Sequence, residues 1–317
     1  MSKVSIIIPL HNAADYIEEA IDSCLHQSYK NLEIIVVENG SVDKSWELIQ
    51  NYKDDRLKRF KIEASSATAA RNYGYNKSTG GYIMFLDADD VLSPNKIENQ
   101  LALINKYGNE VLISCAWGKF TNDIKNTVFL NQKIWNDYEP VDWLVDSWTG
   151  GGMMQTACWL IPKALIEKAG LWDETLKSNP NDDGEFFSRV ILSAKKVHFC
   201  KRSKVYYRTD INNSLSKKIN KEAKASLLQT FINYENSVLR IEDSNRVRLA
   251  LAHNYLNFIY RFHPNPPTLI KKAKIKVDNL KLDVLPQVGG NSFKRIAKIL
   301  GFYNALRLRQ LIVKFKR

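Results

Sequence analysis

The sequence has few of the features that mark disulfide-stabilised, zinc-binding or membrane-spanning chains. Its 317 residues include only four cysteines, at positions 24, 115, 158 and 200, and no C-x-x-C pair. This spacing argues against zinc and is typical of buried thiols in a reducing compartment. No apolar run reaches the roughly 18–20 residues of a membrane-spanning helix, and VSIIIPL near the N-terminus is too short for a signal-peptide core. We therefore expect a cytoplasmic protein.

Histidine is also scarce, and the basic charge is confined to one end. The five histidines lie apart, so no Ser-His-Asp or Cys-His arrangement is visible. Residues 261–317 hold 14 lysines and arginines against Asp278 and Asp283, whereas residues 1–260 hold 32 basic and 32 acidic residues. A polyanionic partner would therefore bind the C-terminal end. Because no recognition motif accompanies the charge, we expect no nucleic acid partner.

The first hundred residues alternate apolar strands with amphipathic helices. Strands are expected at 4–10, 33–41, 57–62 and 82–86, and helices at 16–25, 43–52 and 67–78. Continuous apolar strands between helices predict an α/β fold, with a mostly parallel sheet and helices on both faces. Ligands bind outside the carboxyl ends of such strands, where Pro9–Asn12, Glu38–Ser41 and Asp87–Asp90 would meet.

Three carboxylates, Asp87, Asp89 and Asp90, follow the apolar strand YIMFL. Crowded carboxylates repel one another, but Asp87 and Asp89, at i and i+2, can both reach one divalent cation. Hard oxygen ligands suit Mg²⁺ or Mn²⁺, which keep water molecules and bind substrate phosphates. A solvated acidic turn would have the same pattern, so the aspartates alone do not decide between the two.

Several linked motifs resemble those of the family 2 glycosyltransferases. The stretches VSIIIPLHNAADYIEEAIDSCLHQSYKNLEIIVVENGSVD and ARNYGYNKSTGGYIMFLDADD are similar to the family's IPxYN, DDGSxD, ARNxG and FLDxDD motifs in order and spacing. The resemblance covers residues 4 to about 215. It implies a GT-A fold, which is Rossmann-like, and inverting transfer of a sugar from a nucleotide-sugar donor.

The resemblance also implies roles for residues on the donor side. Asp87 corresponds to the aspartate that contacts the ribose or the metal, Asp89 to the main metal ligand, and Arg71 to the arginine that reaches the nucleotide. Asn39 replaces the usual aspartate that accepts a base N–H, and its amide oxygen can still accept. Glu38 also stands where aspartate is usual. The other implied nucleotide-sugar-binding residues are Pro9, Leu10, His11, Asn12, Ser41 and Ala88.

A second acidic cluster, NPNDDGEFFSRV at 179–190, opens a predicted helix. On its own it is an acidic first turn of the kind that the helix dipole stabilises. It resembles the family motif E-D-x-[DE]-F-x-x-R, which implies Asp183 as general base, with Asp182 as the alternative, and places Arg189 at the motif's arginine. Family members often carry a histidine where this chain has Asp210. This aspartate is either a further metal ligand or an ordinary turn residue.

The middle of the chain is rich in tryptophan, with five of the seven between 135 and 172, around TGGGMMQT. The resemblance places the acceptor loop there. Aromatic faces can bury the C–H face of a sugar, although tryptophan is more often a core residue. The expected acceptor-binding residues are Trp148, Gly151, Gly152, Met153 and Trp159.

The C-terminal residues are predicted to be helical and basic. If residues 292–317 form one continuous helix, as we expect, its apolar residues share one face, and lysines and arginines occupy much of the rest. That pattern is typical of a helix lying on an anionic membrane surface, or of a helix packed on the catalytic domain with a solvated basic face. The apolar face comprises Phe293, Ile296, Leu300, Tyr303 and Leu306.

Two regions are therefore expected: a GT-A domain at 1–215, with a nucleotide-sugar half (1–112) and an acceptor half (113–215), and a helical basic region at 216–317. The expected reaction moves a sugar from a nucleotide sugar to a hydroxyl of a glycan or lipid-linked acceptor. The expected donor is a UDP-sugar. It would use Mn²⁺ or Mg²⁺ at the inner face of a bacterial membrane.

One alternative is a catalytically inactive paralogue that acts as a nucleotide-sugar-binding scaffold. The departures from the family pattern at Asn39 and Asp210 favour this alternative. Another is a sugar nucleotidyltransferase, but no G-x-G-x-R…P-K loop follows the first strand.

Overall fold

Strands from residues 4–162 form a five-stranded sheet in the computed structural model, which describes residues 2–63, 66–209 and 220–315. The strand order is β3-β2-β1-β4-β7, with β1 to β4 parallel and β7 antiparallel to β4. Every residue of β1 and β2 is buried, as the continuous apolar runs predicted. The strands are β1 (Val4–Leu10), β2 (Leu32–Glu38), β3 (Leu57–Lys61), β4 (Tyr82–Phe85) and β7 (Ile161–Pro162).

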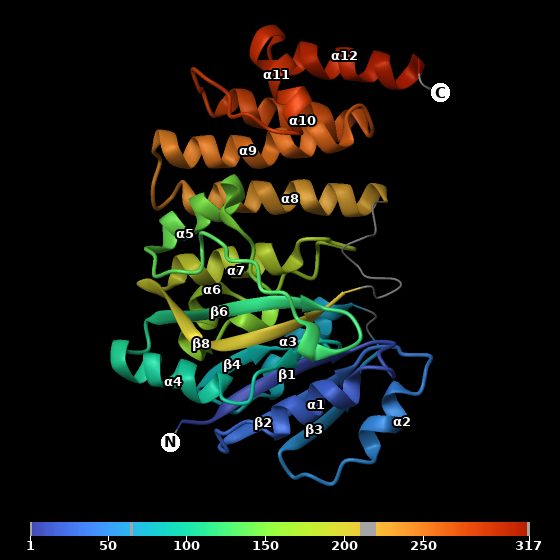
Figure 1. Cartoon of the computed structure of the whole chain (residues 1–317), viewed down its shortest axis with the longest axis vertical. Coiled ribbons are helices and arrows are strands. Elements are labelled where there is room, and N and C mark those ends of the chain that lie inside the picture. Colours follow the sequence, from blue (N-terminus) through green and yellow to red (C-terminus); the bar gives the residue numbers. More distant parts are fainter. Residues whose placement is uncertain (1, 64–65, 210–219, 316–317) are drawn as a thin grey trace.

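A second sheet of order β5-β8-β6 lies next to the first (Figure 1). Hydrogen bonds between Ile113 in β6 and Leu160 beside β7 connect the two sheets. The strands are β5 (Val91–Leu92), β6 (Val111–Phe120) and β8 (Lys196–Arg208). The α-helices of this α/β part are α1 (Ile17–Leu25), α2 (Ser45–Gln50), α3 (Ala67–Lys77), α4 (Lys96–Tyr107), α5 (Pro140–Asp146), α6 (Lys163–Ala169) and α7 (Asp182–Ser193).

The C-terminal helices continue from the α/β part as a stack, with the C-terminus far from the first sheet (Figure 1). Helix α8 packs on α7, and α9 packs on both α8 and α5. The expected order of an α/β domain followed by a helical region is thus confirmed. The helices are α8 (Lys221–Val238), α9 (Asn245–Phe262), α10 (Pro267–Asn279), α11 (Asn291–Leu300) and α12 (Phe302–Phe315). Among the described residues, none of the helices combines the length and apolarity needed to cross a bilayer.

The expectation of one continuous helix over 292–317 is wrong. Helix α11 ends at Leu300 and α12 begins at Phe302, and the two helices pack on each other. The rings of Phe293 and Phe302 meet at 5.8 Å between centroids, and both are buried together with Leu306. Part of the expected apolar face is therefore used for packing inside the protein.

The core of the α/β part encloses a basic side chain among all four thiols. Lys96 of α4 is wholly buried, and its Nζ donates a 2.6 Å hydrogen bond to Oε1 of Gln100. Burial lowers the pKa of Lys96. The four cysteines lie around it on different elements and are free and buried, as predicted: Cys24, Cys115, Cys158 and Cys200.

Candidate active site

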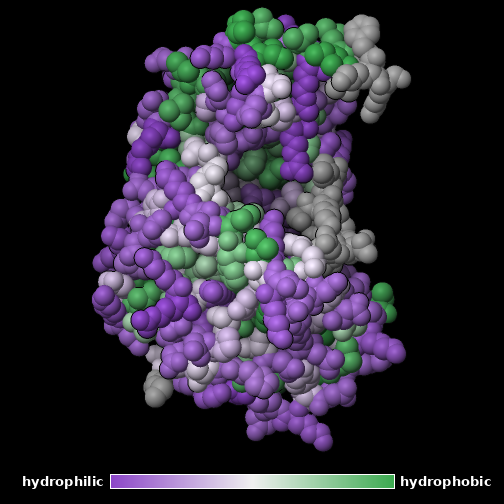
Figure 2. All heavy atoms as spheres, in the orientation of Figure 1, coloured by the Kyte–Doolittle hydropathy of each residue, from purple (hydrophilic) through white to green (hydrophobic). Residues whose placement is uncertain are grey.

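A cleft of about 1470 Å³ lies between the strand ends of the α/β part and the C-terminal helices. The face drawn in Figure 2 is hollowed between these two parts. The cleft brings together residues that lie far apart in the sequence, from both the predicted donor side and the predicted acceptor side. The predicted residues that line it are Pro9, His11, Asn12, Asn39, Arg71, Asp87, Ala88, Asp89, Trp148, Gly152, Met153, Trp159, Asp182 and Asp183.

Other predicted residues lie behind the wall of the cleft or beside it. Leu10 is a fully buried core residue of β1. The buried Glu38 carboxylate accepts a hydrogen bond from the backbone N–H of Ser41, and Ser41 Oγ accepts one from the backbone of Asn12 at 3.1 Å. These residues shape the turn that carries Asn39. Gly151 is not among the residues that line the cleft, and Asp210 lies outside the described residues.

The amide of Asn39 offers an open hydrogen-bond acceptor on the donor side. Its Oδ1 is buried and has no hydrogen-bond partner among the described residues. A buried polar atom without a partner costs roughly 1–3 kcal/mol, so this oxygen suits a ligand N–H. The substitution of asparagine for the usual aspartate thus leaves the accepting atom in place.

Arg71 of α3 connects the two sides of the cleft. It donates 2.8 Å hydrogen bonds to Oδ1 of Asp87, just after β4, and to Oδ2 of Asp182, at the start of α7. The guanidinium also lies 4.4 Å from the centre of the Trp172 ring. Burial opposes its charge, but the carboxylates of Asp87 and Asp182 raise the pKa of Arg71. Arg71 is therefore a fixed cation between the strand-end carboxylates and the second acidic cluster.

Asp89 and Asp90 have different environments. Asp90 is buried, and its Oδ1 accepts a 3.0 Å hydrogen bond from the backbone of Arg208. Asp89 lines the cleft, and its carboxylate has no hydrogen-bond or ion-pair partner in another described residue. Burial and the nearby charge of Asp87 raise the pKa of Asp89 to about 7. The cluster therefore contains one carboxylate that is used in packing and one that is open to a ligand.

These carboxylates fit a hard divalent cation. Asp89 is unpaired, and only Oδ1 of Asp87 is engaged by Arg71, which leaves oxygens of two side chains for an ion. Mg²⁺ and Mn²⁺ bind well to one or two carboxylates when substrate phosphates and water supply the other ligands. Within the described residues, no group of three or more His, Cys, Asp or Glu side chains could hold a metal ion by itself.

The carboxylates of Asp182 and Asp183 also differ in whether a cation holds them. Asp182 is held by Arg71, and its Oδ1 accepts a 2.9 Å hydrogen bond from the backbone of Asp183. Asp183 lines the cleft and is half-buried, and it pairs with no cation among the described residues. Burial and the charge of Asp182 raise the pKa of Asp183 to about 7, which is suited to a base at neutral pH.

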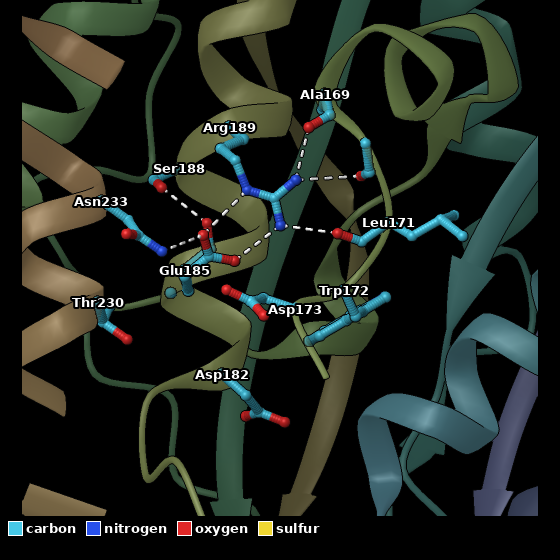
Figure 3. Close-up of polar contacts among 12 residues, drawn as sticks. Ala169, Leu171, Trp172, Asp173, Asp182, Glu185, Ser188, Arg189, Thr230 and Asn233 are labelled. Atoms are coloured by element: carbon cyan, nitrogen blue, oxygen red, sulfur yellow. Dashed lines mark hydrogen bonds and ion pairs between the residues drawn. The ribbon is translucent and has the colours of Figure 1, made fainter. Parts of the chain in front are cut away.

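Arg189 acts behind the cleft rather than in it. Figure 3 shows its guanidinium between the Glu185 carboxylate and the carbonyl oxygens of the loop that follows α6. It donates to Glu185 at 3.0 and 2.7 Å and to the carbonyl of Leu171 at 2.8 Å. Glu185 is buried and also accepts a 3.1 Å hydrogen bond from Asn233 of α8. The pair fixes α7 to the loop that carries Trp172.

The predicted acceptor tryptophans, Trp148 and Trp159, both line the cleft and are both buried. Trp159 is fully buried and stacks on Phe187 at 5.4 Å between ring centroids. Trp148 belongs to a short irregular helix, η2 (Ser147–Gly151), and stacks on Tyr234 of α8 at 4.7 Å. His253 of α9 contacts the carbonyl of Trp148 at 2.6 Å. The C-terminal helices thus hold the acceptor loop in place.

Sequence reasoning missed the residues that α8 contributes. Four side chains at intervals of four residues form one row, the α8 stripe, consisting of Glu222, Ser226, Thr230 and Tyr234. Each holds the segment 177–181, which leads directly into Asp182. The hydrogen bonds join Glu222 to Ser178 (3.4 Å), Ser226 to the carbonyl of Lys177 (2.7 Å), Thr230 to Asn179 (2.9 Å) and Tyr234 to Asn181 (2.8 Å). The only sequence signal was polar residues at helical spacing.

The fold and the cleft define a GT-A type α/β domain with acidic residues at the strand ends. A family model described as glycosyl transferase family 2 matches residues 5–168, slightly more than half of the chain. The chain belongs to this family. The matched residues include the strand-end carboxylates but stop short of Asp183 and the C-terminal helices.

Curated relatives agree with this assignment, and a solved structure shares the fold. An uncharacterized glycosyltransferase of Rickettsia typhi is 35% identical over 209 residues, covering 62% of this chain and 64% of the relative. Another, of Rickettsia bellii, is 34% identical over 263 residues, covering 80% of this chain and 37% of the relative. The chain thus spans less than two thirds of the length of these relatives. A crystal structure of S. aureus TarS 1–349 in complex with UDP-GlcNAc is similar in fold, with a TM-score of 0.65 at 18% identity, covering 88% of this chain and 79% of that chain.

Proposed function

We propose that this protein is a metal-assisted, inverting glycosyltransferase that moves a sugar from a nucleotide sugar to a hydroxyl of a glycan or lipid-linked acceptor. One observation carries the proposal. A single cleft holds the unpaired Asp89 beside Asp87 and, across Arg71, the Asp183 carboxylate. Asp183 accepts a 2.7 Å hydrogen bond from the backbone of Gly184 and pairs with no cation among the described residues. Family membership and the fold shared with a UDP-GlcNAc-binding structure support UDP as the nucleotide.

The donor side would bind the nucleotide diphosphate. Asp89 and Asp87 would hold Mg²⁺ or Mn²⁺, which when bound neutralises the charge that develops on the departing diphosphate. The unpartnered Oδ1 of Asn39 would accept an N–H of the base, with Pro9 and His11 lining the same end of the cleft. Through its 2.8 Å hydrogen bond, Arg71 would hold the Asp87 carboxylate in position.

The acceptor side would supply one base. The Asp183 carboxylate takes the proton of the acceptor hydroxyl while that oxygen forms a bond to the anomeric carbon. The bond from the anomeric carbon to the phosphate oxygen breaks, and the nucleoside diphosphate leaves with the electron pair. A single displacement on the face opposite the leaving group inverts the anomeric centre. The cleft presents no competing cysteine or serine–histidine nucleophile in its described part.

The direct test is release of nucleoside diphosphate from UDP-, GDP- and dTDP-sugars, with Mn²⁺ or Mg²⁺ and with EDTA. Slow hydrolysis needs no acceptor, because water takes its place. Release from one donor that stops in EDTA would support the proposal and identify the nucleotide. In a separate assay, release of pyrophosphate from a nucleoside triphosphate and a sugar 1-phosphate would instead indicate a nucleotidyltransferase. If calorimetry detects nucleotide binding but no donor is turned over, the chain is a binding scaffold.

The same proposal places the protein at an anionic membrane surface through α11 and α12. Apolar atoms gather over these two helices at the top of Figure 2. Ile299 is 83% exposed and Leu311 is 52% exposed, with Leu300 and Ile312 also exposed. Exposed basic side chains on the same helices include Arg295, Lys298, Arg307 and Arg309. Apolar residues ringed by cations suit the boundary of an anionic bilayer, where a lipid-linked acceptor would lie.

A further inference from the structure

Tyr234 of α8 is held beside the first turn of α7 by contacts on three sides. Its ring stacks on Trp148, and its hydroxyl oxygen accepts a 2.8 Å hydrogen bond from the side-chain amide of Asn181. On the third side is Gly184, the residue after Asp183. An ideal Cβ at Gly184 would lie 2.4 Å from the Tyr234 hydroxyl oxygen. A glycine at this position is therefore what allows the hydroxyl to come so close to the α7 backbone.

The hydroxyl of Tyr234 has an unused hydrogen. Its oxygen accepts from Asn181, but its O–H donates to no described residue. Burial, and the neighbouring charge of Asp183, raise the pKa of Tyr234, so the hydroxyl remains a donor at neutral pH. Tyr234 also lines the cleft together with Asp183. The O–H of Tyr234 is therefore a hydrogen-bond donor without an acceptor, and it lies in the cleft beside the candidate base. A ligand oxygen would supply the missing acceptor.

We propose that Tyr234 is an acceptor-binding residue, whose hydroxyl donates a hydrogen bond to the oxygen of the acceptor hydroxyl that Asp183 deprotonates. The inference rests on the proposed function, and it assigns part of the acceptor site to the helical C-terminal region. One lone pair of the acceptor oxygen receives the Tyr234 hydrogen and the other attacks the anomeric carbon. The acceptor proton then points to Asp183. As this proton leaves, the hydrogen bond from Tyr234 stabilises the negative charge that grows on the oxygen.

The rest of the α8 stripe supports this placement. Ser226 and Thr230, which are buried, hold Lys177 and Asn179, so the segment before Asp182 runs along the same helix that carries Tyr234. The base and the hydroxyl are thereby fixed to one rigid element. Such shared support matters because a displacement of about 1 Å can slow a positioned reaction by roughly a hundredfold.

The test uses donor hydrolysis by the full chain, in which water replaces the acceptor hydroxyl, with UDP-GlcNAc as the first probe and Mn²⁺ present. Tyr234→Phe removes only the hydroxyl and keeps the stacked ring. We expect kcat to fall by about tenfold or more, while the donor Kd from calorimetry stays within about twofold of wild type. Tyr107→Phe is the control, because the Tyr107 hydroxyl, on the exposed end of α4, has no partner among the described residues.

A second pair of variants approaches the same hydroxyl from its other side. In Gly184→Ala, the new methyl group would displace Tyr234 or Asn181 and lower kcat in the same way. Gly81→Ala is its control, since a Cβ there would meet nothing within 4 Å. Unfolding curves show which variants are folded, and only folded variants are compared.

Three outcomes are distinct. A loss of kcat with unchanged donor affinity in Tyr234→Phe supports the inference. Wild-type kcat in folded Tyr234→Phe overturns it and leaves the proposed function intact. A wild-type protein that neither binds nor hydrolyses any nucleotide sugar of the panel overturns the proposed function, and the role of Tyr234 falls with it.

Discussion

The guanidinium of Arg71 donates a 2.8 Å hydrogen bond to Asp182, which lies 111 residues further along the chain. Through its second hydrogen bond, to Asp87, it joins the ends of the parallel strands to the first turn of α7. The donor side and the acceptor side of the cleft therefore share one cation. Their spacing is fixed by a side chain rather than by the backbone.

Loss of this cation should destabilise the protein. In Arg71→Gln, Asp87 and Asp182 lose their common partner, and breaking a buried ion pair costs about 3–5 kcal/mol. We expect the lower end, because the two carboxylates are 31% and 25% exposed. Denaturant unfolding measures the difference. Arg56→Gln, which breaks the more exposed pair with Asp54, should cost no more than about 1 kcal/mol. Equal costs for the two variants would contradict the bridging role.

Asp183→Asn should stop transfer but not donor binding. Removal of a general base lowers kcat by about 10²–10⁴, whereas the donor contacts lie on the other side of Arg71. Calorimetry and turnover measured on the same sample separate the two effects, with the exposed Asp55→Asn as control. Wild-type turnover in Asp183→Asn would remove Asp183 as the base.

The pH dependence follows from the same carboxyl. A general base acts in its deprotonated form, and burial raises the pKa of Asp183 to about 7. Turnover should therefore rise with pH up to about 7 and then level off, falling about tenfold per pH unit on the acid side. The measurement is kcat against pH at saturating donor and metal. A profile that is flat between pH 5 and about pH 8 would exclude this titration.

Asp89→Asn should remove the response to divalent cations. In the wild-type protein the neighbouring carboxylates of Asp87 and Asp89 both have free oxygens, so Mn²⁺ should raise its melting temperature by binding the folded state. The variant loses the unpaired carboxylate and should show little shift, and its UDP affinity should become independent of EDTA. The comparison uses thermal unfolding with and without Mn²⁺. A full metal-induced shift in the variant would place the ion elsewhere.

Membrane binding through α11 and α12 should depend on both their apolar and their basic residues. The double variant Ile299→Asp/Leu311→Asp should lose at least about tenfold in affinity for phosphatidylglycerol vesicles, since it puts charge where apolar surface would be buried. Val42→Asp, at a 92% exposed position outside these helices, is the control. Co-sedimentation at low and high salt provides the measurement. Equal binding to phosphatidylcholine vesicles would show that the basic residues play no part.

The donor side was predictable because its signals are local. Each strand is a continuous apolar run, and the polar residues that follow it must meet at one sheet edge once the strands are parallel. Asp87, Asp89 and Asn39 reach the cleft for this reason. Leu10 and Glu38 do not. Leu10 is a core residue of β1, and the Glu38 carboxylate braces the turn that carries Asn39.

The acceptor side was less predictable because its contacts join distant segments. Nothing in the row from Glu222 to Tyr234 indicates that its partners lie at 177–181, and the motif containing Glu185 and Arg189 does not reveal that this pair faces away from the cleft. The break between α11 and α12 was missed for a different reason. The apolar spacing from Phe293 to Leu306 continues through Gly301, but the rings of Phe293 and Phe302 pack together only when the chain bends there.

The four thiols around Lys96 can serve as native probes of unfolding. Cys24, Cys115 and Cys158 are inaccessible to solvent, and Cys200 is 4% exposed. They reside on α1, β6, β8 and the short helix before β7, so no single fraying element uncovers them all. An alkylating reagent can reach the complete set only when the α/β core opens. The rate of thiol labelling at increasing denaturant then measures the opening of that core, with no engineered probe.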